Sequence, residues 1–211
     1  MLVIFDWDGT LIDSTAKIVS SMQEAVAELN LPSISDESVM GIIGLGLPEA
    51  VRVLYPDADQ EALDQLRAGY SKHFIIADQT PCDFYPGVEV VLDELKVQGH
   101  QLAVATGKSR RGLDRVLSNL KMQSFFDASR CADETASKPS PLMLHQLLSE
   151  FGVGAQASLM GGDTACDLEM AANAGVPSVG VSYGAHPIER LLPHQPLKII
   201  DQFEQLLPCV D

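Results

Sequence analysis

The sequence predicts an α/β protein in which an all-helical insertion interrupts a parallel β-sheet and its covering helices. Leu2–Phe5 is an apolar run without helical periodicity, a pattern typical of a buried strand in a parallel sheet, and further strands are expected over Gln101–Ala105 and Ser158–Gly161. Helix patterns alternate with strand patterns after Pro86, whereas the region that follows the first run contains helix patterns alone. Such a shift in pattern indicates a helical subdomain inserted after the first strand.

The composition is that of an ordered globular protein. A chain of 211 residues can hold one good-sized core with an insertion, or two small domains. Apolar residues make up 46% of the chain, and no stretch is low in complexity. The net charge of -15 argues against nucleic acid or an anionic membrane surface as a partner. An anionic small molecule stays compatible with this charge, because the local charge at a site can oppose the global one.

The cysteines and histidines show no metal-ligand spacing. The four cysteines are scattered without a C-x-x-C pair, and the five histidines are scattered as well, so we expect no zinc site. No apolar run approaches the length of a membrane span, and the sequence begins with a strand pattern instead of a basic signal peptide. A reducing cytoplasm fits these features best.

The first strand, Leu2–Phe5, leads directly into Asp6 and Asp8, which are followed by Gly9 and Thr10. Open α/β sheets bind ligands at the carboxyl ends of their strands, where these carboxylates would lie. Two close negative charges require compensation by a shared proton or a bound cation, and oxygen ligands at this spacing suit Mg²⁺. A strand that ends in a simple Asp-Gly turn explains the same segment equally well.

The insertion is expected to consist of helices joined by short turns. The expected helices are Ser14–Leu29, Asp36–Ile43, one with Pro48 in its first turn, and Asp59–Ile76. Asp13 or Ser14 can cap the first of them. We interpret the turn Gly44–Gly46 as a helix–helix connection, although its glycines would also let the backbone approach a ligand over the sheet.

The α/β pattern resumes after the insertion. The first expected elements are a helix over Gly87–Gln98 that Gly99 closes, a strand over Gln101–Ala105, a helix to about Leu120 and a strand within Phe125–Cys131. The next are a helix that Ser140 and Pro141 begin, a strand over Ser158–Gly161 and a helix over Leu168–Ala174 that Gly175 closes. The last are strands over Val176–Val181 and Leu197–Ile200, and a helix over Asp201–Leu207.

Further polar residues stand where these strands end or helices begin. Thr106 and Gly107 open a helix, and a hydroxyl with free backbone N–H groups at that place can bind an anion. Asp163 follows a strand, and Asp167 lies in the first turn of the next helix, so both can face one crevice. Lys138 precedes the helix that Ser140 and Pro141 begin. Each feature also has an ordinary structural explanation: a common strand-to-helix turn for Thr106–Gly107, a solvated side chain for Lys138, and a favourable helix N-terminus for Asp167.

In this order, the motifs Asp-x-Asp-Gly-Thr, Thr-Gly, Lys-Pro and Gly-Asp-x-x-x-Asp resemble those of the haloacid dehalogenase superfamily. The opening Phe-Asp-Trp-Asp-Gly-Thr-Leu-Ile-Asp-Ser is similar to that of its phosphoglycolate phosphatase-like branch. The resemblance covers nearly the whole chain and departs at no motif position, while the insertion carries no motif that we can match. It implies a Rossmann-like core formed by residues 1–13 and 82–211, and a small α-helical cap formed by residues 14–81.

The resemblance also implies a magnesium-dependent phosphatase that acts on a small organic phosphate monoester. Asp6 would attack phosphorus to form an aspartyl-phosphate, and Asp8 would be the general acid and base. Mg²⁺ would be held by Asp6, the backbone carbonyl of Asp8, Asp163 and Asp167, the last directly or through a water. Phosphoglycolate is one of several substrates that this branch suggests.

Three further residues complete the implied site. Thr106 and the Gly107 N–H would bind the phosphoryl oxygens, and Lys138 would offset the charge on the nucleophile and the phosphate. This concentration of positive charge accounts for a phosphate site in an acidic protein, because Mg²⁺ and the lysine reverse the local sign.

Other functions of the same fold stay open. Asp8 favours phosphoryl transfer, since the dehalogenase and phosphonate-cleaving relatives lack the second aspartate. A sugar-phosphate mutase would keep all the motifs and differ by shielding the aspartyl-phosphate from water. A non-catalytic phosphate-binding or signalling module is a further alternative, but response-regulator receivers carry their phosphorylated aspartate after a later strand. The sequence leaves the oligomeric state open.

Overall fold

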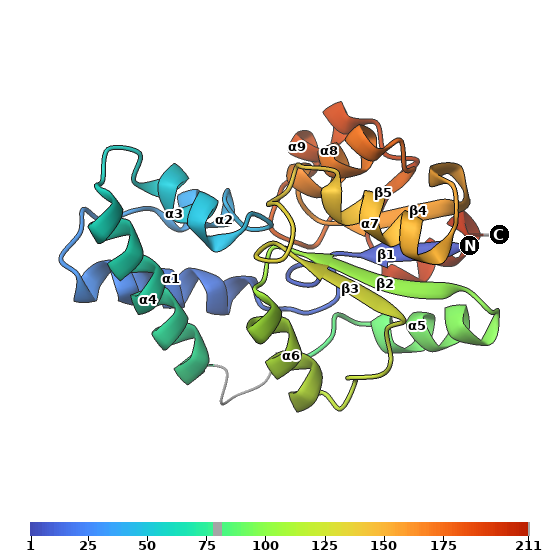
Figure 1. Cartoon of the computed structure of the whole chain (residues 1–211), viewed down its shortest axis with the longest axis horizontal. Helices are drawn as coiled ribbons and strands as arrows, with labels where there is room; N and C mark the ends of the chain where they lie inside the picture. Colours follow the sequence, from blue (N-terminus) through green and yellow to red (C-terminus); the bar gives the residue numbers. More distant parts are fainter. Residues whose placement is uncertain (78–81, 211) are drawn as a thin grey trace.

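Across residues 1–77 and 82–210, which the computed structural model describes, six parallel strands form one central sheet with helices on both faces (Figure 1). The strands are β1 (Leu2–Phe5), β2 (Gln101–Thr106), β3 (Ala128–Cys131), β4 (Ser158–Gly162), β5 (Ser178–Val181) and β6 (Lys198–Ile200). Their order is β3-β2-β1-β4-β5-β6, so β1 pairs with both β2 and β4 at the centre of the sheet. This arrangement confirms the predicted α/β class with a Rossmann-like parallel sheet.

Alternating residues of the central strands face two different helical layers. The described helices of this part of the chain are α5 (Val88–Val97), α6 (Arg110–Asn119), α7 (Leu142–Phe151), α8 (Ala165–Ala174), α9 (Ile188–Leu191), and the 3-10 helices η1 (Ala155–Ala157), η2 (Leu192–His194) and η3 (Phe203–Cys209). Val3 and Phe5 pack in one hydrophobic cluster with α5, α6 and η3, whereas Leu2 and Ile4 pack in another with α7 and α8. Because both of its faces are covered, the central strand β1 is an unbroken apolar run.

The insertion forms a separate group of helices beyond the carboxyl end of the sheet (Figure 1). Its described helices are α1 (Thr15–Glu28), α2 (Asp36–Met40), α3 (Leu47–Leu54) and α4 (Gln60–Ala77). They share a further hydrophobic cluster, which includes Met22, Val39 and Leu66 and is joined by Ala185 from outside the insertion. The predicted end of the insertion at residue 81 lies outside the described residues. Even α4, which spans 18 residues, falls short of what a membrane crossing needs, as does every other described helix.

Several element boundaries differ from the predicted ones. Helix α8 begins at Ala165 instead of Leu168, because Thr164 and Asp167 form a reciprocal capping box that starts the helix one turn earlier. The final helix is the 3-10 helix η3, which contains Pro208. Ser14 occupies the N-cap position of α1 as predicted, but its hydroxyl makes no capping hydrogen bond.

Candidate functional site

Three carboxylates meet at the carboxyl end of the sheet. Asp6 follows β1, Asp163 follows the neighbouring strand β4, and Asp167 projects from the first turn of α8. All three side chains are buried, and one oxygen of each lies within 4.8 Å of the others. The structure therefore brings together three of the four predicted metal ligands, and we call them the acidic triad.

Lys138, in the loop before α7, is buried against this acidic triad. Its Nζ lies 2.7 Å from Oδ1 of Asp6 and 2.6 Å from Oδ1 of Asp167. The contact with Asp6 is an ion pair without hydrogen-bond alignment, since Asp6 Oδ1 has no hydrogen-bond partner within the described part of the chain. The buried Lys138 ammonium is thus shared between two carboxylates of the triad.

Hydrogen bonds orient the other two carboxylates of the triad. Asp163 accepts from the Thr10 hydroxyl at 2.7 Å and from the Ala185 N–H at 2.7 Å. Asp167 accepts from the N–H and the hydroxyl of Thr164 at 3.0 and 2.7 Å. Gly9 has φ 81° and lies so close to Asp163 that a Cβ at this position would collide with its carboxylate.

Burial and the neighbouring carboxylates disfavour the charged forms of Asp6 and Asp163. Burial raises the pKa of Asp6 well above its ordinary value; Lys138 opposes the rise, and Asp167 and Asp163 add to it. Burial and the charge of Asp167 raise the pKa of Asp163 to about 7. Burial lowers the pKa of Lys138, but Asp167 and Asp6 outweigh that effect and raise it. Among the described residues one buried ammonium opposes three carboxylates, so the oxygen-only donor set fits a hard divalent cation.

Asp8, the fourth predicted ligand, holds its carboxylate outside the triad. Its Oδ1 accepts from the Ser14 hydroxyl at 2.6 Å, and its Oδ2 lies 2.9 Å from Nζ of Lys108. Lys108 was not predicted as a site residue. The available signal was its place two residues after Thr106, in the turn that was predicted to bind an anion.

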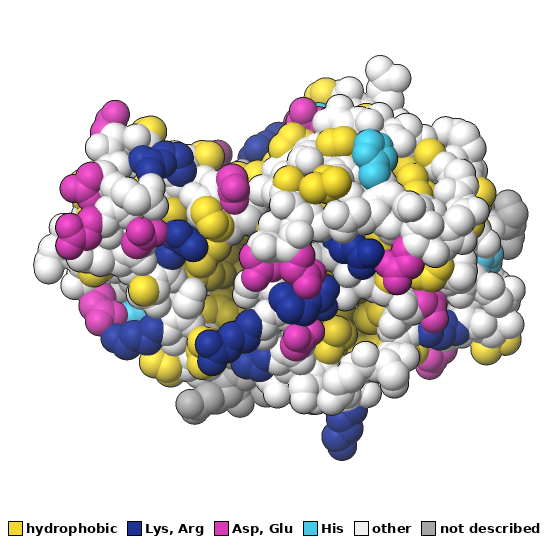
Figure 2. All heavy atoms as spheres, viewed as in Figure 1, with side chains coloured by type: hydrophobic (Ala, Val, Ile, Leu, Met, Phe, Trp, Pro, Cys, Tyr) yellow, Lys and Arg dark blue, Asp and Glu magenta, His cyan; other side chains and the backbone are white. Residues whose placement is uncertain are grey.

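The site opens into a cleft of about 670 Å³ between the sheet and the insertion. Asp6, Asp8, Thr106 and Gly107 line the cleft on the side of the sheet. Its other lining includes apolar and basic side chains, among them Ile18, Met22, Arg67, Tyr70, Phe74, Arg111 and Arg115. Figure 2 shows the hollow, with hydrophobic atoms inside it and Lys and Arg side chains along its edge.

The turn Gly44–Gly46 lies against the sheet end. The Gly46 N–H donates to Ser137 Oγ at 2.8 Å, and a Cβ on Gly107 would come within 2.5 Å of the Leu45 carbonyl oxygen. A Cβ on Gly44 would likewise collide with the hydroxyl of Thr164. The interpretation of this turn as a helix–helix connection alone was therefore wrong, because its glycines also permit a close backbone approach to the site.

The family can be read from similarity to known proteins. A model of the haloacid dehalogenase-like hydrolases matches residues 3–181. The chain belongs to this family. A protein of Dickeya dadantii named "Probable phosphatase IndB" is 35% identical over 98% of this chain and 91% of its own length. A phosphoglycolate phosphatase of Pseudomonas syringae pv. tomato is 32% identical over 100% of this chain and 80% of its own.

A solved structure within the family has the same architecture. The crystal structure of a predicted phosphoglycolate phosphatase from Haemophilus somnus superposes with a TM-score of 0.90. It is 26% identical, and the match covers 100% of this chain and 97% of the other. These similarities confirm the predicted family and enzyme class, a phosphatase of the haloacid dehalogenase type.

Proposed function

We propose that this protein is a Mg²⁺-dependent phosphatase that hydrolyses a small organic phosphate monoester through an aspartyl-phosphate on Asp6. The observation that carries the proposal is the Asp6 carboxylate, which belongs to the buried triad, lies 2.7 Å from the Lys138 ammonium, and lines the cleft. The relatives named phosphoglycolate phosphatase support a phosphoglycolate-like substrate.

The phosphoryl group would bind at the carboxyl end of β2. The Thr106 hydroxyl and the Gly107 N–H would donate to its oxygens, and the position of both residues beside Asp6 in the lining of the cleft supports this role. The ammonium of Lys138 would offset the negative charge that accumulates as Asp6 approaches the phosphoryl group.

The acidic triad would hold the metal. Asp6, Asp163, Asp167 and the backbone carbonyl of Asp8 are the proposed ligands, Asp167 either directly or through a water. When bound, Mg²⁺ would supply positive charge to the phosphoryl oxygens and align the phosphate for in-line attack.

The reaction would proceed in two displacements at phosphorus. An Asp6 oxygen forms a bond to phosphorus while the ester P–O bond breaks, and the leaving oxygen takes a proton from Asp8. A water molecule then attacks the aspartyl-phosphate, Asp8 accepts its proton, and inorganic phosphate leaves with Asp6 restored.

We further propose that residues 14–81 act as a cap over a core of residues 1–13 and 82–211. The turn Gly44–Gly46 and the apolar wall of the cleft support this role, because they lie opposite the proposed phosphate site. Closure would exclude water and bring the substrate against residues that set specificity. A cytoplasmic location stays a prediction from the cysteine usage.

Addition of Mg²⁺ is expected to raise the thermal unfolding temperature, and to do so more at a pH well above 7 than well below it. Protons compete with the cation for Asp163, whose pKa burial and Asp167 raise to about 7. At a concentration about 100 times the Kd, binding would add about 2.7 kcal/mol to the free energy of unfolding. Thermal unfolding with Mg²⁺ or with a chelator measures this. An unchanged response to Mg²⁺ in Asp163→Asn would contradict the proposed metal site.

The function itself is tested by phosphate release from a panel of esters, with Mg²⁺ or with a chelator. The panel contains p-nitrophenyl phosphate, phosphoglycolate, sugar phosphates and nucleoside monophosphates. We expect Mg²⁺-dependent release, with small phosphate esters such as phosphoglycolate among the best substrates. Absence of release from every ester would refute the phosphatase proposal in favour of a sugar-phosphate mutase or a non-catalytic protein, and an isomerisation assay on sugar phosphates would then separate these two.

A further inference from the structure

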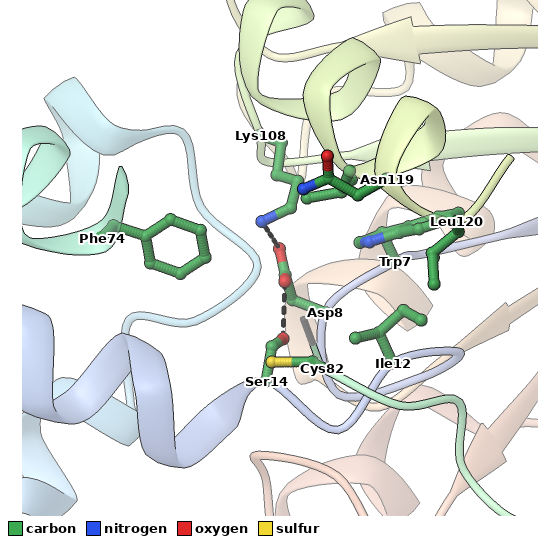
Figure 3. A pocket seen from close by; sticks show the side chains of 10 residues that line it. Trp7, Asp8, Ile12, Ser14, Phe74, Cys82, Lys108, Asn119 and Leu120 are labelled. Carbon is green, nitrogen blue, oxygen red and sulfur yellow. Dashed lines mark hydrogen bonds and ion pairs between the residues drawn. The ribbon is translucent and has the colours of Figure 1, made fainter. Parts of the chain in front are cut away.

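The carboxylate of Asp8 is held between two side chains, as Figure 3 shows. One is Ser14, which lies where the chain leaves the sheet end to begin α1 and donates to Asp8 Oδ1. The other is Lys108, which follows β2 and pairs with Asp8 Oδ2. Both oxygens of Asp8 are therefore engaged, and one of the two partners stands at the junction with the helical insertion.

Lys108 also contacts the insertion itself. Its Nζ lies 4.6 Å from the centroid of the Phe74 ring, and Phe74 belongs to α4. In Figure 3 the Phe74 ring points across the cleft toward the Lys108 ammonium, and Asp8 lies on the other side of this ammonium. A single ammonium thus bridges a carboxylate of the core and an aromatic face of the insertion, by a charge pair on one side and a cation–π contact on the other.

Low exposure to solvent strengthens both the Lys108–Asp8 ion pair and the Lys108–Phe74 contact. The side chains of Lys108 and Asp8 are only 11% and 13% exposed. Trp7, Ile12 and Leu120 line a small cavity of about 20 Å³ beside them, and this apolar lining limits screening by bulk water. The position of the Lys108 ammonium therefore bears directly on the orientation of the Asp8 carboxyl group.

We propose that Lys108 is a positioning residue for Asp8. Phe74 couples the position of the Lys108 ammonium to the contact between the insertion and the core. The inference rests on the proposed function, because it takes Asp8 as the group that protonates the leaving alcohol. With the insertion seated, Phe74 covers the ammonium and restricts its rotamers, so Lys108 and Ser14 hold Asp8 in one orientation at the cleft. When the insertion moves away, the ammonium loses the ring and Asp8 loses this restraint. Proton transfer from Asp8 to the leaving group therefore depends on closure of the insertion over the core.

The test compares kcat/KM for an alkyl phosphate and for p-nitrophenyl phosphate. An alkoxide needs a proton as it leaves, whereas nitrophenolate does not. The value of kcat/KM includes only the steps up to and including ester cleavage, so it reports on this proton transfer. For Lys108→Met we expect a loss of about 30-fold on the alkyl ester and at most about 3-fold on the aryl ester, since misplacing a catalytic group is this costly. Lys108→Arg should restore most of the loss, because a guanidinium pairs with a carboxylate and stacks on a ring.

Phe74→Leu is expected to give the same leaving-group dependence with a smaller loss, about 5-fold on the alkyl ester. If the ring acts through the ammonium, the double variant with Lys108→Met should lose no more than Lys108→Met alone. Fully additive losses would overturn the coupling through Phe74.

A matched control exists outside the cleft. Nζ of Lys96 lies 4.9 Å from the Phe125 ring centroid and 3.5 Å from Oδ1 of Asp127, so this lysine has the same two kinds of partner. Lys96→Met should leave both kcat/KM values unchanged, and a leaving-group effect there would count against a specific role of Lys108.

The remaining outcomes separate this inference from the proposed function. Equal losses on both esters in Lys108→Met would mean that Lys108 binds the phosphoryl group, which would overturn the positioning role. Lys108→Met should add no further loss in an Asp8→Asn background, and an additional loss there would overturn it as well. If Asp8→Asn itself shows no leaving-group dependence, the assignment of Asp8 as general acid fails, and the inference fails with it.

Discussion

Asp6→Asn is expected to abolish turnover while leaving the fold intact. The amide is isosteric with the carboxylate but is a poor nucleophile, so the aspartyl-phosphate cannot form and kcat should fall by about 10⁵-fold or more. Stability should not suffer in the absence of metal. The substitution removes one of three buried carboxylates that repel one another, and Lys138 keeps its ion pair with Asp167.

Phosphate release and thermal unfolding, measured on the same preparation, check this expectation. Asp93→Asn on α5 is the matched control, because Asp93 is exposed and remote from the triad, and both activity and unfolding temperature should be unchanged. Near-normal hydrolysis by Asp6→Asn would refute Asp6 as the nucleophile. Loss of the cooperative unfolding transition would instead refute the prediction of an intact fold.

Lys138→Met is expected to have the largest effect on stability. The methionine retains much of the side-chain volume, but the triad loses its buried positive charge, and breaking a buried charge pair costs about 3–5 kcal/mol. The free energy of unfolding of the variant should also fall as the pH rises to about 7 and above. Burial and Asp167 raise the pKa of Asp163 to about 7 while Lys138 lowers it, so without Lys138 the folded protein holds this proton to a still higher pH. The stability that the proton contributes is lost as the pH rises.

Denaturant unfolding in a chelator and in Mg²⁺ measures this effect. We expect Mg²⁺ to recover part of the lost stability, because a bound cation replaces the missing charge, while turnover stays at least about 100-fold reduced. Lys72→Met is the control: the Lys72–Glu28 pair is 2.7 Å long but half exposed, and such pairs contribute about 1 kcal/mol or less. A Lys138 variant as stable as the Lys72 variant in the chelator would contradict the charge balance proposed for the triad.

The central strands and the proximity of the three acids could be predicted from the amino-acid sequence. Short apolar runs without helical period favour strands buried on both faces, and parallel strands present their carboxyl ends at one edge. Residues that directly follow β1 and β4, Asp6 and Asp163, therefore had to converge once these strands became neighbours. Asp167 was predictable for the same reason, since the helix after β4 starts at that edge.

The position of the insertion on the sheet could not be predicted from the sequence and is known from the three-dimensional contacts. The contact of Gly46 with Ser137, and the bridge from Phe74 through Lys108 to Asp8, join segments far apart in the chain. Local periodicity carries no information about such distances, because they depend on how side chains of two separately packed hydrophobic clusters fit across a cleft. For that reason the sequence pattern indicates only a turn at Lys108. Its place in the site follows from the contacts of its ammonium with Asp8 on one side and Phe74 on the other.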